Sequence, residues 1–312
     1  MPELPEVTTT VNGLQEVLPG LKILDVWTDL AKKNPIKQFR ETIKNESFWK
    51  YFKKEVCNVK VLNVERRAKN ILINLSNKKT ILIHLKMTGH IIYGNYVFNK
   101  KLNPPIGGWA PHKTEREALH DSYNRFIHVV FTLSNKKQFV MCDSRKFGKV
   151  TIIDTDTAHE TLHLKGIGPE PLDRSFTFQK FKDRLLTRPI WSIKTVLMDQ
   201  SVIAGIGNIY SDEMLWMADI NPESKPNKIP TKLLKSLYQS MNKVLKKGID
   251  FGGDSMSDYR DINGERGKFQ NHHNVYRKKG EVCSKRGCRG VIIRKVINGR
   301  SAHFCNMHQK LF

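Results

Sequence analysis

The sequence predicts an α+β fold of several domains, with strands in the first half, helices in the middle and a small β-hairpin module at the end. The first half holds short apolar runs separated by turn residues, a pattern typical of antiparallel strands. Helical periodicity replaces this pattern from Phe178 onward, and three of the five cysteines lie near the C-terminus. A length of 312 residues allows roughly two domains and a small module.

The N-terminal domain is expected over residues 1–155. Residues 6–18 carry apolar side chains at helical spacing and stop at Pro19-Gly20, so a helix is expected there. Strand-like runs follow at residues 21–27, 59–64, 71–75, 81–85, 126–133, 138–142 and 149–153. We expect these runs to form a β-sandwich flanked by helices, with the Pro- and Gly-rich segment 94–124 as a loop or insertion.

A helical domain is expected over residues 156–262. Its clearest helices are expected from Ile193, over 209–217 and over 233–248. Residues 251–270 are polar and glycine-rich, which predicts a loop. Residues 263–312 are expected to form a separate basic module. From position 266 onward the sequence has 12 Lys and Arg residues and a single acid, Glu281.

The charge of the chain points to a polyanionic partner. Lys and Arg total 53 against 30 Asp and Glu, so the formal net charge is +23, and nucleic acid is favoured over a membrane surface. No apolar run approaches the ~18 residues of a membrane span. The acidic, Pro-rich start is unlike a signal peptide. We therefore expect a cytoplasmic, nucleoid-associated, non-secreted monomer.

Cysteine spacing predicts a metal site at the C-terminus. Cys57 and Cys142 lie alone in apolar surroundings and are interpreted as core residues. Four residues form two short pairs with 16 residues between them: Cys283-x4-Cys288 and Cys305-x2-His308. This set supplies four ligands for tetrahedral zinc, and a closed four-ligand site predicts one structural Zn²⁺ ion. The alternative interpretation is three unrelated thiols and a surface histidine.

A hairpin is expected between the two ligand pairs. Residues 290–304 read as two strands around the turn Asn298-Gly299, so the module is predicted to be a zinc ribbon with Arg300 leaving its tip. His303 is an alternative fourth ligand with poorer spacing. His272 and His273 are interpreted as loop residues.

Two further features are ambiguous from the residues alone. Gly205 and Gly207 precede a helix start, where backbone N–H groups can bind phosphate with help from Lys194; the alternatives are a plain helix entry and a solvated lysine. If Met1 is removed, Pro2 presents a secondary amine able to attack an aldehyde-type carbon, with Glu3 as general acid. The alternative is that a Met-Pro start carries no function.

A series of motifs runs in order along the chain. They are Pro2-Glu-Leu-Pro-Glu-Val7, Arg67-Ala-Lys69, His84-Leu-Lys-Met-Thr-Gly89, Asp143-Ser-Arg-Lys-Phe-Gly148, Gly168-Pro-Glu-Pro-Leu172, Met198-Asp-Gln200 through Gly205-Ile-Gly-Asn-Ile-Tyr210, and Gly252-Gly253 through Phe269-Gln270. Together with the ribbon, they resemble the formamidopyrimidine-DNA glycosylase and endonuclease VIII family of base-excision repair enzymes. The formamidopyrimidine branch is the more similar, and the resemblance extends from Pro2 to Gln309.

The resemblance implies roles for single residues. Pro2 would be the Schiff-base nucleophile, Glu3 the proton donor that helps to open the sugar, and Lys69 an aid to elimination that also holds phosphate. The side chains implied to fill the space of a flipped-out nucleotide are Met87, Arg145 and Phe147. Those implied to contact phosphates are Lys194, Asn208 and Tyr210 in a helix–two-turns–helix element, and Arg300, which we also count with the catalytic group. The loop 252–260 would close over the extruded base.

The chain departs from the family pattern in its ribbon. The family usually has four cysteines at x2 spacing, whereas here the first pair is x4 and the last ligand is His308. A basic residue that the family carries just before the Lys194 helix is replaced near Arg188-Pro189.

The resemblance predicts a bifunctional DNA glycosylase and AP lyase acting on damaged double-stranded DNA. It would excise oxidised purines such as 8-oxoguanine and formamidopyrimidines through a Pro2 Schiff base, followed by β- and δ-elimination. The purine preference depends on the loop 252–259. The alternatives are an endonuclease VIII-like specificity for oxidised pyrimidines and a catalytically silent zinc-ribbon DNA-binding protein.

Overall fold

The computed structural model describes residues 1–33, 35–99 and 108–312, and the chain divides into two compact units. Met1–Lys165 and Phe251–Lys268 form the first unit, and Gly166–Asp250 and Phe269–Phe312 form the second. The loop expected at 251–270 therefore belongs largely to the N-terminal unit and not to the helical domain to which the sequence assigned it. The helices and the C-terminal module share the second unit.

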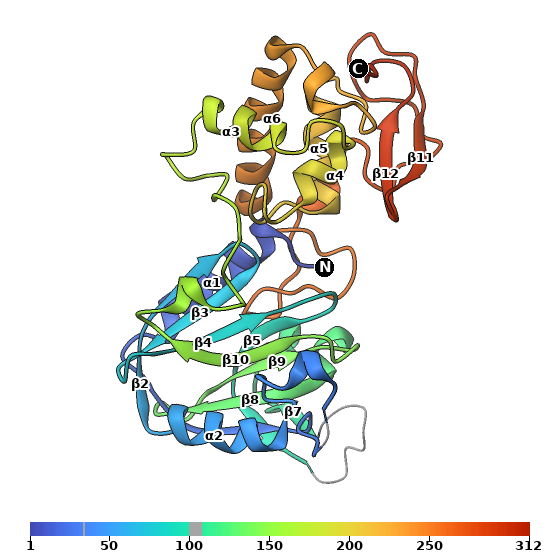
Figure 1. Ribbon diagram of the computed structural model, residues 1–312. Coiled ribbons are helices and arrows are strands. Elements are labelled where there is room, and N and C mark those ends of the chain that lie inside the picture. Colours follow the sequence, from blue (N-terminus) through green and yellow to red (C-terminus); the bar gives the residue numbers. More distant parts are fainter. Residues whose placement is uncertain (34, 100–107) are drawn as a thin grey trace. The chain divides into compact units, whose positions relative to one another are not determined.

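A continuous antiparallel sheet of eight strands forms the first unit, in the order β10-β4-β3-β2-β1-β8-β9-β5 (Figure 1). Its strands are β1 (Lys22–Thr28), β2 (Val59–Arg67), β3 (Asn70–Leu75), β4 (Lys79–His84), β5 (His90–Gly94), β8 (Ile127–Leu133), β9 (Gln138–Cys142) and β10 (Lys149–Asp154). Apolar side chains from both halves of this sheet, among them Ile83 and Phe131, share one core cluster. The two halves are thus the layers of the predicted β-sandwich.

Two helices accompany the sheet. Helix α1 (Leu4–Val17) contacts β2 and β3 (Figure 1), and it buries the apolar stripe that predicts it. Helix α2 (Glu46–Val56) was not predicted from the sequence. Its side chain cap is Asn45, which accepts from the Ser47 N–H, and only Phe52 and Val56 are buried along it. Phe48 and Trp49 also pack against the core, so the helix has an apolar face at helical spacing that was not recognised in the sequence.

The described parts of the segment 94–124, residues 94–99 and 108–124, are more ordered than the expected loop. They contain β6 (Tyr96–Phe98) paired with β7 (Trp109–Pro111), followed by two 3₁₀ turns at Glu117–His120 and Ser122–Arg125. Phe98 and Trp109 pack edge to face at 5.5 Å, and residues 100–107 lie outside the described residues. The packing of these two aromatic rings supports the pairing of β6 with β7.

The second unit contains four α-helices and a hairpin in its described residues. They are α3 (Phe178–Leu186), α4 (Ile193–Met198), α5 (Asn208–Met217), α6 (Thr231–Asp250), β11 (Ile292–Ile297) and β12 (Arg300–Cys305). Asn298 and Gly299 have φ values of 45° and 73°, the left-handed backbone that a two-residue hairpin turn requires. The predicted helices and hairpin are therefore confirmed. Among the described residues, no helix combines the length and apolarity needed to cross a bilayer.

Candidate active site and metal centre

Strand register brings three loops to one end of the sheet. Asn70 pairs with His84, and His84 pairs with Lys149, so the turn before β3, the loop after β4 and the loop before β10 are neighbours. The predicted residues Lys69, Met87, Arg145 and Phe147 lie on these loops. Lys69 is 5% exposed, whereas Met87 and Phe147 are 40% and 46% exposed. Two large apolar side chains thus face solvent beside a buried lysine.

The Asp143 carboxylate fixes the two loops that carry the apolar pair. It accepts hydrogen bonds from the Thr88 hydroxyl, from the Gly148 N–H at 2.6 Å and from the Arg145 N–H at 3.2 Å. The Arg145 guanidinium lies 4.5 Å from the centre of the Phe147 ring. Asp143 is 3% exposed, so a buried carboxylate positions the loops from which Met87 and Phe147 project into solvent. No role for Asp143 was predicted from the sequence.

A second buried carboxylate organises the N-terminus. The Glu3 N–H donates to Glu6 Oε2 at 2.7 Å, and the two residues form a capping box at the start of α1. Glu6 Oε1 accepts the Asp254 N–H at 2.7 Å, and the Tyr259 hydroxyl donates to the Glu6 carbonyl at 3.0 Å. Pro2 is buried beside Glu3, which is 2% exposed. Glu6 therefore joins the Pro2-Glu3 terminus to the loop 251–268.

Glycine is required where this loop crosses α1. Gly253 has φ +84°, and a Cβ there would lie 2.8 Å from Glu6 Cγ. A Cβ on Gly267 would lie within 2.2 Å of the Gly253 carbonyl oxygen. The Gly252-Gly253 motif is therefore a close backbone approach to Glu6. The capping-box spacing of Glu3 and Glu6 is the sequence signal that could have identified Glu6.

Cationic groups dominate the electrostatics at this end of the sheet. Burial, reinforced by Lys86 and Lys69, lowers the pKa of His84 to about 3, so its imidazole is neutral and Nδ1 accepts the Lys86 N–H at 3.0 Å. Burial and then Lys86 lower the pKa of Lys149 to about 8. Such a cluster favours a polyanion.

In the second unit, the structure corrects the prediction for Lys194. Its side chain is 1% exposed, and its ammonium donates a short hydrogen bond to Asp212 and a longer one, 3.3 Å, to Ser211 Oγ. A further bond of 3.4 Å reaches the Asn208 carbonyl. Lys194 is consumed by an internal ion pair, so it fixes the first turn of α5 and does not present its charge to a phosphate.

Tyr210 is corrected in the same way. It is 0% exposed, and its ring stacks on Phe269 at 4.9 Å. Asn208, in contrast, is partly exposed at the first turn of α5. Asn208 thus remains the phosphate candidate of this element, through the N–H groups of its side-chain amide, which can donate to a phosphate oxygen.

Two successive acids of α5 hold the C-terminal module. Asp212 Oδ2 accepts the His303 N–H at 2.9 Å and lies 3.1 Å from His303 Nδ1. The Glu213 carboxylate accepts the backbone N–H groups of Asn274, Val275 and Tyr276 at 2.9–3.0 Å. Because His303 is engaged with Asp212, it is not the alternative metal ligand. Neither acid was identified from the sequence.

Arg300 is exposed at the first position of β12, as the sequence predicts. The Asn298 side-chain amide donates to Thr195 Oγ1 at 2.9 Å, which ties the hairpin turn to α4. Arg300 lines a cavity of about 230 Å³ together with Trp191 and Lys194. The guanidinium therefore lies close to the α4–α5 element.

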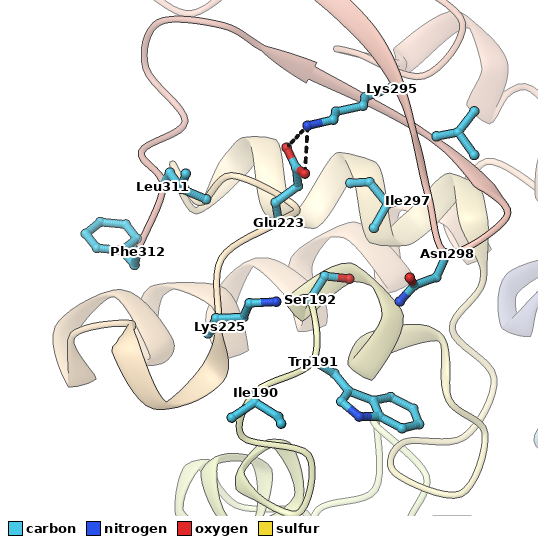
Figure 2. Close-up of a pocket in the computed structure, with 11 residues that line it drawn as sticks. Ile190, Trp191, Ser192, Glu223, Lys225, Lys295, Ile297, Asn298, Leu311 and Phe312 are labelled. Carbon is cyan, nitrogen blue, oxygen red and sulfur yellow. Dashed lines mark hydrogen bonds and ion pairs between the residues drawn. The ribbon is translucent and has the colours of Figure 1, made fainter.

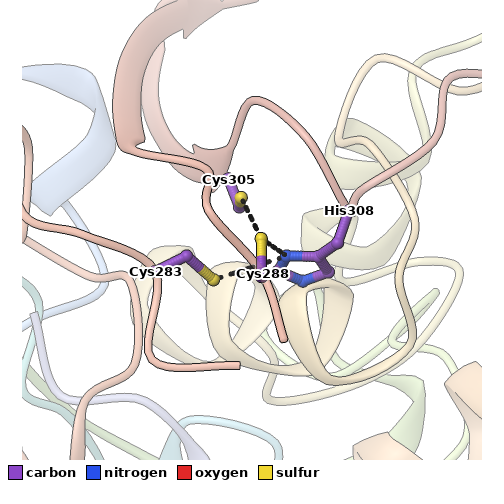
Figure 3. Close-up of side chains that lie close together, drawn as sticks. All are labelled: Cys283, Cys288, Cys305 and His308. Carbon is purple, nitrogen blue, oxygen red and sulfur yellow. Dashed lines mark hydrogen bonds between the residues drawn. The ribbon is translucent and has the colours of Figure 1, made fainter. Parts of the chain in front are cut away.

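The four predicted metal ligands converge (Figure 3). Their ligand atoms lie within 4.8 Å of one another, and no other such group occurs in the described part of the chain. Cys283 Sγ and Cys288 Sγ lie 3.4 and 3.7 Å from His308 Nδ1, and Cys288 Sγ lies 3.6 Å from Cys305 Sγ. Tetrahedral zinc with thiolate and imidazole bonds gives edges of roughly 3.6–3.8 Å, so the residues fit the ion.

Neighbouring groups orient these ligands. The Trp216 indole N–H lies 3.4 Å from Cys283 Sγ, and His308 Nε2 lies 3.3 Å from the Trp216 carbonyl oxygen. This leaves His308 Nδ1 to face the thiols. Burial lowers the pKa of His308, which favours the neutral, ligating form.

A groove of about 850 Å³ lies beside the hairpin of the second unit (Figure 2). Ile190, Trp191 and Ile297 supply apolar walls, and an ion pair of 2.8 Å joins Lys295 to Glu223. None of the predicted catalytic residues lines it. Size alone therefore does not locate the chemistry in this fold.

Comparison with known proteins accounts for nearly the whole chain. Residues 1–150 match the formamidopyrimidine-DNA glycosylase N-terminal domain, and residues 167–260 match the formamidopyrimidine-DNA glycosylase H2TH domain. The formamidopyrimidine-DNA glycosylase of Pelotomaculum thermopropionicum is 36% identical over 100% of both chains, and that of Ruegeria sp. is 33% identical over 99% and 100%. The Lactococcus lactis Fpg, solved with DNA containing an abasic site, superposes with a TM-score of 0.79 at 30% identity, covering 99% of each chain.

Proposed function

The chain belongs to the formamidopyrimidine-DNA glycosylase family, and from this we propose that it excises oxidised purines from double-stranded DNA and then cuts the strand. Membership makes it a DNA glycosylase of base-excision repair. The observation that carries the proposal is the N-terminal Pro2-Glu3 pair, buried at the start of α1 and bonded through Glu6 to the loop 251–268. A protein that only bound DNA would have no use for an amine at this place.

The proposed reaction begins once Met1 has been removed. The Pro2 nitrogen lone pair forms a bond to the sugar C1′, and the bond from C1′ to the base breaks, its electron pair leaving with the base, which takes up a proton. Glu3 delivers a proton to the ring oxygen, the sugar opens and an iminium ion results. The iminium acidifies the C2′ hydrogen, so the 3′-phosphate and then the 5′-phosphate leave as the strand is cut. Water finally releases Pro2.

Other residues bind and shape the DNA. Met87 and Phe147 would replace the stacking lost when the nucleotide is flipped out, and the Arg145 guanidinium would bond the orphaned base. Their 40% and 46% exposure and their common support by Asp143 favour this role. Lys69, Asn208 and Arg300 are the candidate phosphate contacts that remain after Lys194 and Tyr210 are set aside.

One zinc ion per chain is proposed at Cys283, Cys288, Cys305 and His308. Four protein ligands leave no open position, so the ion would stabilise the ribbon that carries Arg300 and take no part in bond breaking. We also propose that the protein acts as a monomer.

The proposed substrate class follows from the loop 251–268 and from what similar proteins bind. A MutM structure that superposes with a TM-score of 0.78 at 30% identity holds DNA with carbocyclic 8-oxo-G, and a Lactococcus lactis FPG variant holds Fapy-dG DNA. Oxidised purines are accordingly the proposed lesions. Oxidised pyrimidines are the alternative.

Borohydride trapping tests the proposal. Duplexes that carry 8-oxoguanine, a formamidopyrimidine, an oxidised pyrimidine or no lesion would each be incubated with protein and reductant, which converts the iminium into a stable amine. We expect covalent complexes with the two purine lesions and none with intact DNA. Absence of any complex would reject the Schiff base, and preferential trapping on the pyrimidine lesion would reassign the substrate.

A further inference from the structure

The segment 94–124, to which the sequence assigned no role, supports the loop 251–268. The Tyr93 N–H donates to the Ile262 carbonyl at 2.7 Å, just before this segment begins. Arg116 donates to Asn263 Oδ1 at 2.9 Å. A Cβ on Gly264 would lie 2.6 Å from the Ala118 carbonyl oxygen, so the two backbones are in direct contact. All these residues belong to the first unit.

Arg260 makes the strongest connection. It is 2% exposed, although arginine is rarely buried, and its Nε and Nη2 donate to Asp121 Oδ2 at 3.1 and 3.0 Å. Its Nη1 donates to the carbonyls of Ser257 and Tyr259 at 2.7 and 2.8 Å, which are in the loop itself. One buried guanidinium therefore clamps the loop backbone to the segment 94–124.

Asp121 is prepared for this partner. Its Oδ1 accepts the Tyr123 N–H at 2.8 Å, and the Tyr123 ring lies 4.7 Å from the Arg260 guanidinium carbon. Burial opposes ionisation, but the Tyr123 N–H and Arg260 hold the pKa of Asp121 below its usual value. The carboxylate is therefore charged throughout the neutral range.

The clamped loop is also in contact with both functional groups of the first unit. Asp254 bonds Glu6, which bonds the Glu3 N–H. Asp258 Oδ1 accepts a hydrogen bond of 3.1 Å from Ser144 Oγ, in the loop that carries Arg145 and Phe147. Between these two contacts Met256 is 38% exposed, so the tip of the loop is free to meet a ligand while its base is held.

We propose that Asp121 and Arg260 are positioning residues that hold the loop 251–268 against an extruded base, and that residues 108–124 thereby determine how efficiently damaged bases are released. This inference rests on the proposed function. It predicts an effect on base release and none on strand cleavage at an abasic site, because an abasic site has no base for the loop to hold.

The test compares Arg260→Gln and Asp121→Asn with the wild type. Single-turnover base release from an 8-oxoguanine duplex should slow by about 10- to 100-fold, the effect expected when a contacting group is misplaced by roughly 1 Å. Cleavage of a pre-formed abasic site should be unchanged. Asp121→Asn keeps Arg260 and its bonds to the Ser257 and Tyr259 carbonyls, so it serves as the test if Arg260→Gln does not fold.

Asp154→Asn is the matched control. It removes an exposed 2.6 Å ion pair with Lys79 in the same unit, at the opposite end of β4 and β10. Both reactions should then proceed as in the wild type. Equal loss of base release and abasic cleavage in the Asp121 and Arg260 variants would overturn the proposal, and so would no loss of either.

Hydrogen exchange provides a readout that needs no DNA. Amides of residues 254–260 should exchange faster in Asp121→Asn, whereas those of β3 and β4 should not. Unchanged exchange in this loop would overturn the clamp itself. If the wild-type protein released no base, the proposed function would be wrong. The hydrogen-exchange result would still test the clamp, because it does not depend on base release.

Discussion

In the first unit, the candidate reactive and wedge-forming groups lie on loops, and single carboxylates gather the N–H groups of those loops. Glu6 serves the N-terminus, and Asp143 serves the loops of Met87 and Phe147. In the second unit, the DNA-binding candidates depend on a lysine ion pair at Asp212 and on four converging metal ligands. The first arrangement places the reactive groups at one end of a preformed sheet, and the second places cations on a small module with four residues that fit a metal.

The difference teaches that the two units should fail independently. Damage to the carboxylate-held loops should change bond breaking or lesion selection, and damage to the metal-held module should change affinity for all DNA. The following changes test that separation, from the largest expected effect to the smallest.

Blocking the Pro2 nitrogen should have the largest effect. A form with residues retained ahead of Pro2, or Pro2→Gly, should lose roughly 10⁵-fold or more of trapping and strand cleavage, as expected for loss of a nucleophile. Binding to abasic DNA should persist. The control is the extended protein after proteolysis that exposes Pro2, which should recover activity; wild-type trapping by the blocked form would show that another amine reacts.

Raising the salt concentration should have the next largest effect, because it weakens the phosphate contacts of both units. For about 6–10 phosphate contacts, affinity should fall by roughly 10³–10⁵-fold between 50 and 200 mM salt. Fluorescence anisotropy with damaged and undamaged duplexes would measure the slope. The single-turnover rate at saturating enzyme should change little, and a flat titration would contradict the electrostatic account.

Removal of zinc should weaken binding by about 10- to 100-fold, the loss of a charge-assisted contact at Arg300. Cys305→Ser is the variant, and Cys57→Ser, which alters a thiol remote from the ligand set, is its control. Metal analysis and binding would be measured on both. Zinc absent from the wild type, or full affinity after its loss, would contradict the prediction.

Asn208→Ala should have the smallest effect, about 2- to 10-fold in affinity, because it removes one hydrogen bond from an uncharged donor to a phosphate that water can solvate in its place. Damaged and undamaged duplexes should be affected equally, because a phosphate contact carries no lesion information. Met87→Ala, on the other unit, should instead weaken the damaged duplex more. If Asn208→Ala discriminated between the duplexes, the division of roles between the units would be wrong.

The sequence predicted the elements whose periodicity is strong. The stripe of α1, the central strands and the Asn298-Gly299 hairpin all lie where the patterns placed them. The four candidate metal ligands also converge as the sequence predicts, because the short spacing within each pair keeps its two side chains close together. Helix α2 was missed although Phe48, Trp49, Phe52 and Val56 stand at helical spacing. The pairing of β6 with β7 was missed because it depends on tertiary contacts such as the Phe98–Trp109 packing.

What the sequence could not show was which polar residues face inward. Lys194 and Tyr210 lie in a motif that favours phosphate binding. Lys194 is nevertheless buried in an ion pair with Asp212, and Tyr210 is buried against the ring of Phe269, and no sequence pattern indicates either pairing. Asp143 and Glu6 were missed for the opposite reason. Their carboxylates matter because they accept backbone N–H groups that only the folded chain brings to them. Arg260 paired with Asp121 across 139 positions leaves no local signal at all.

The Glu213 carboxylate sets a limit to how far metal loss can spread. It bonds the backbone of residues 274–276, immediately before the ribbon, and those bonds involve no metal ligand. We therefore expect residues 274–276 to stay on α5 if zinc, bound as proposed, is lost, because this anchor does not depend on the ion. A cell short of zinc would thus keep the start of the C-terminal module in place, ready for the four ligands to gather again when the ion returns.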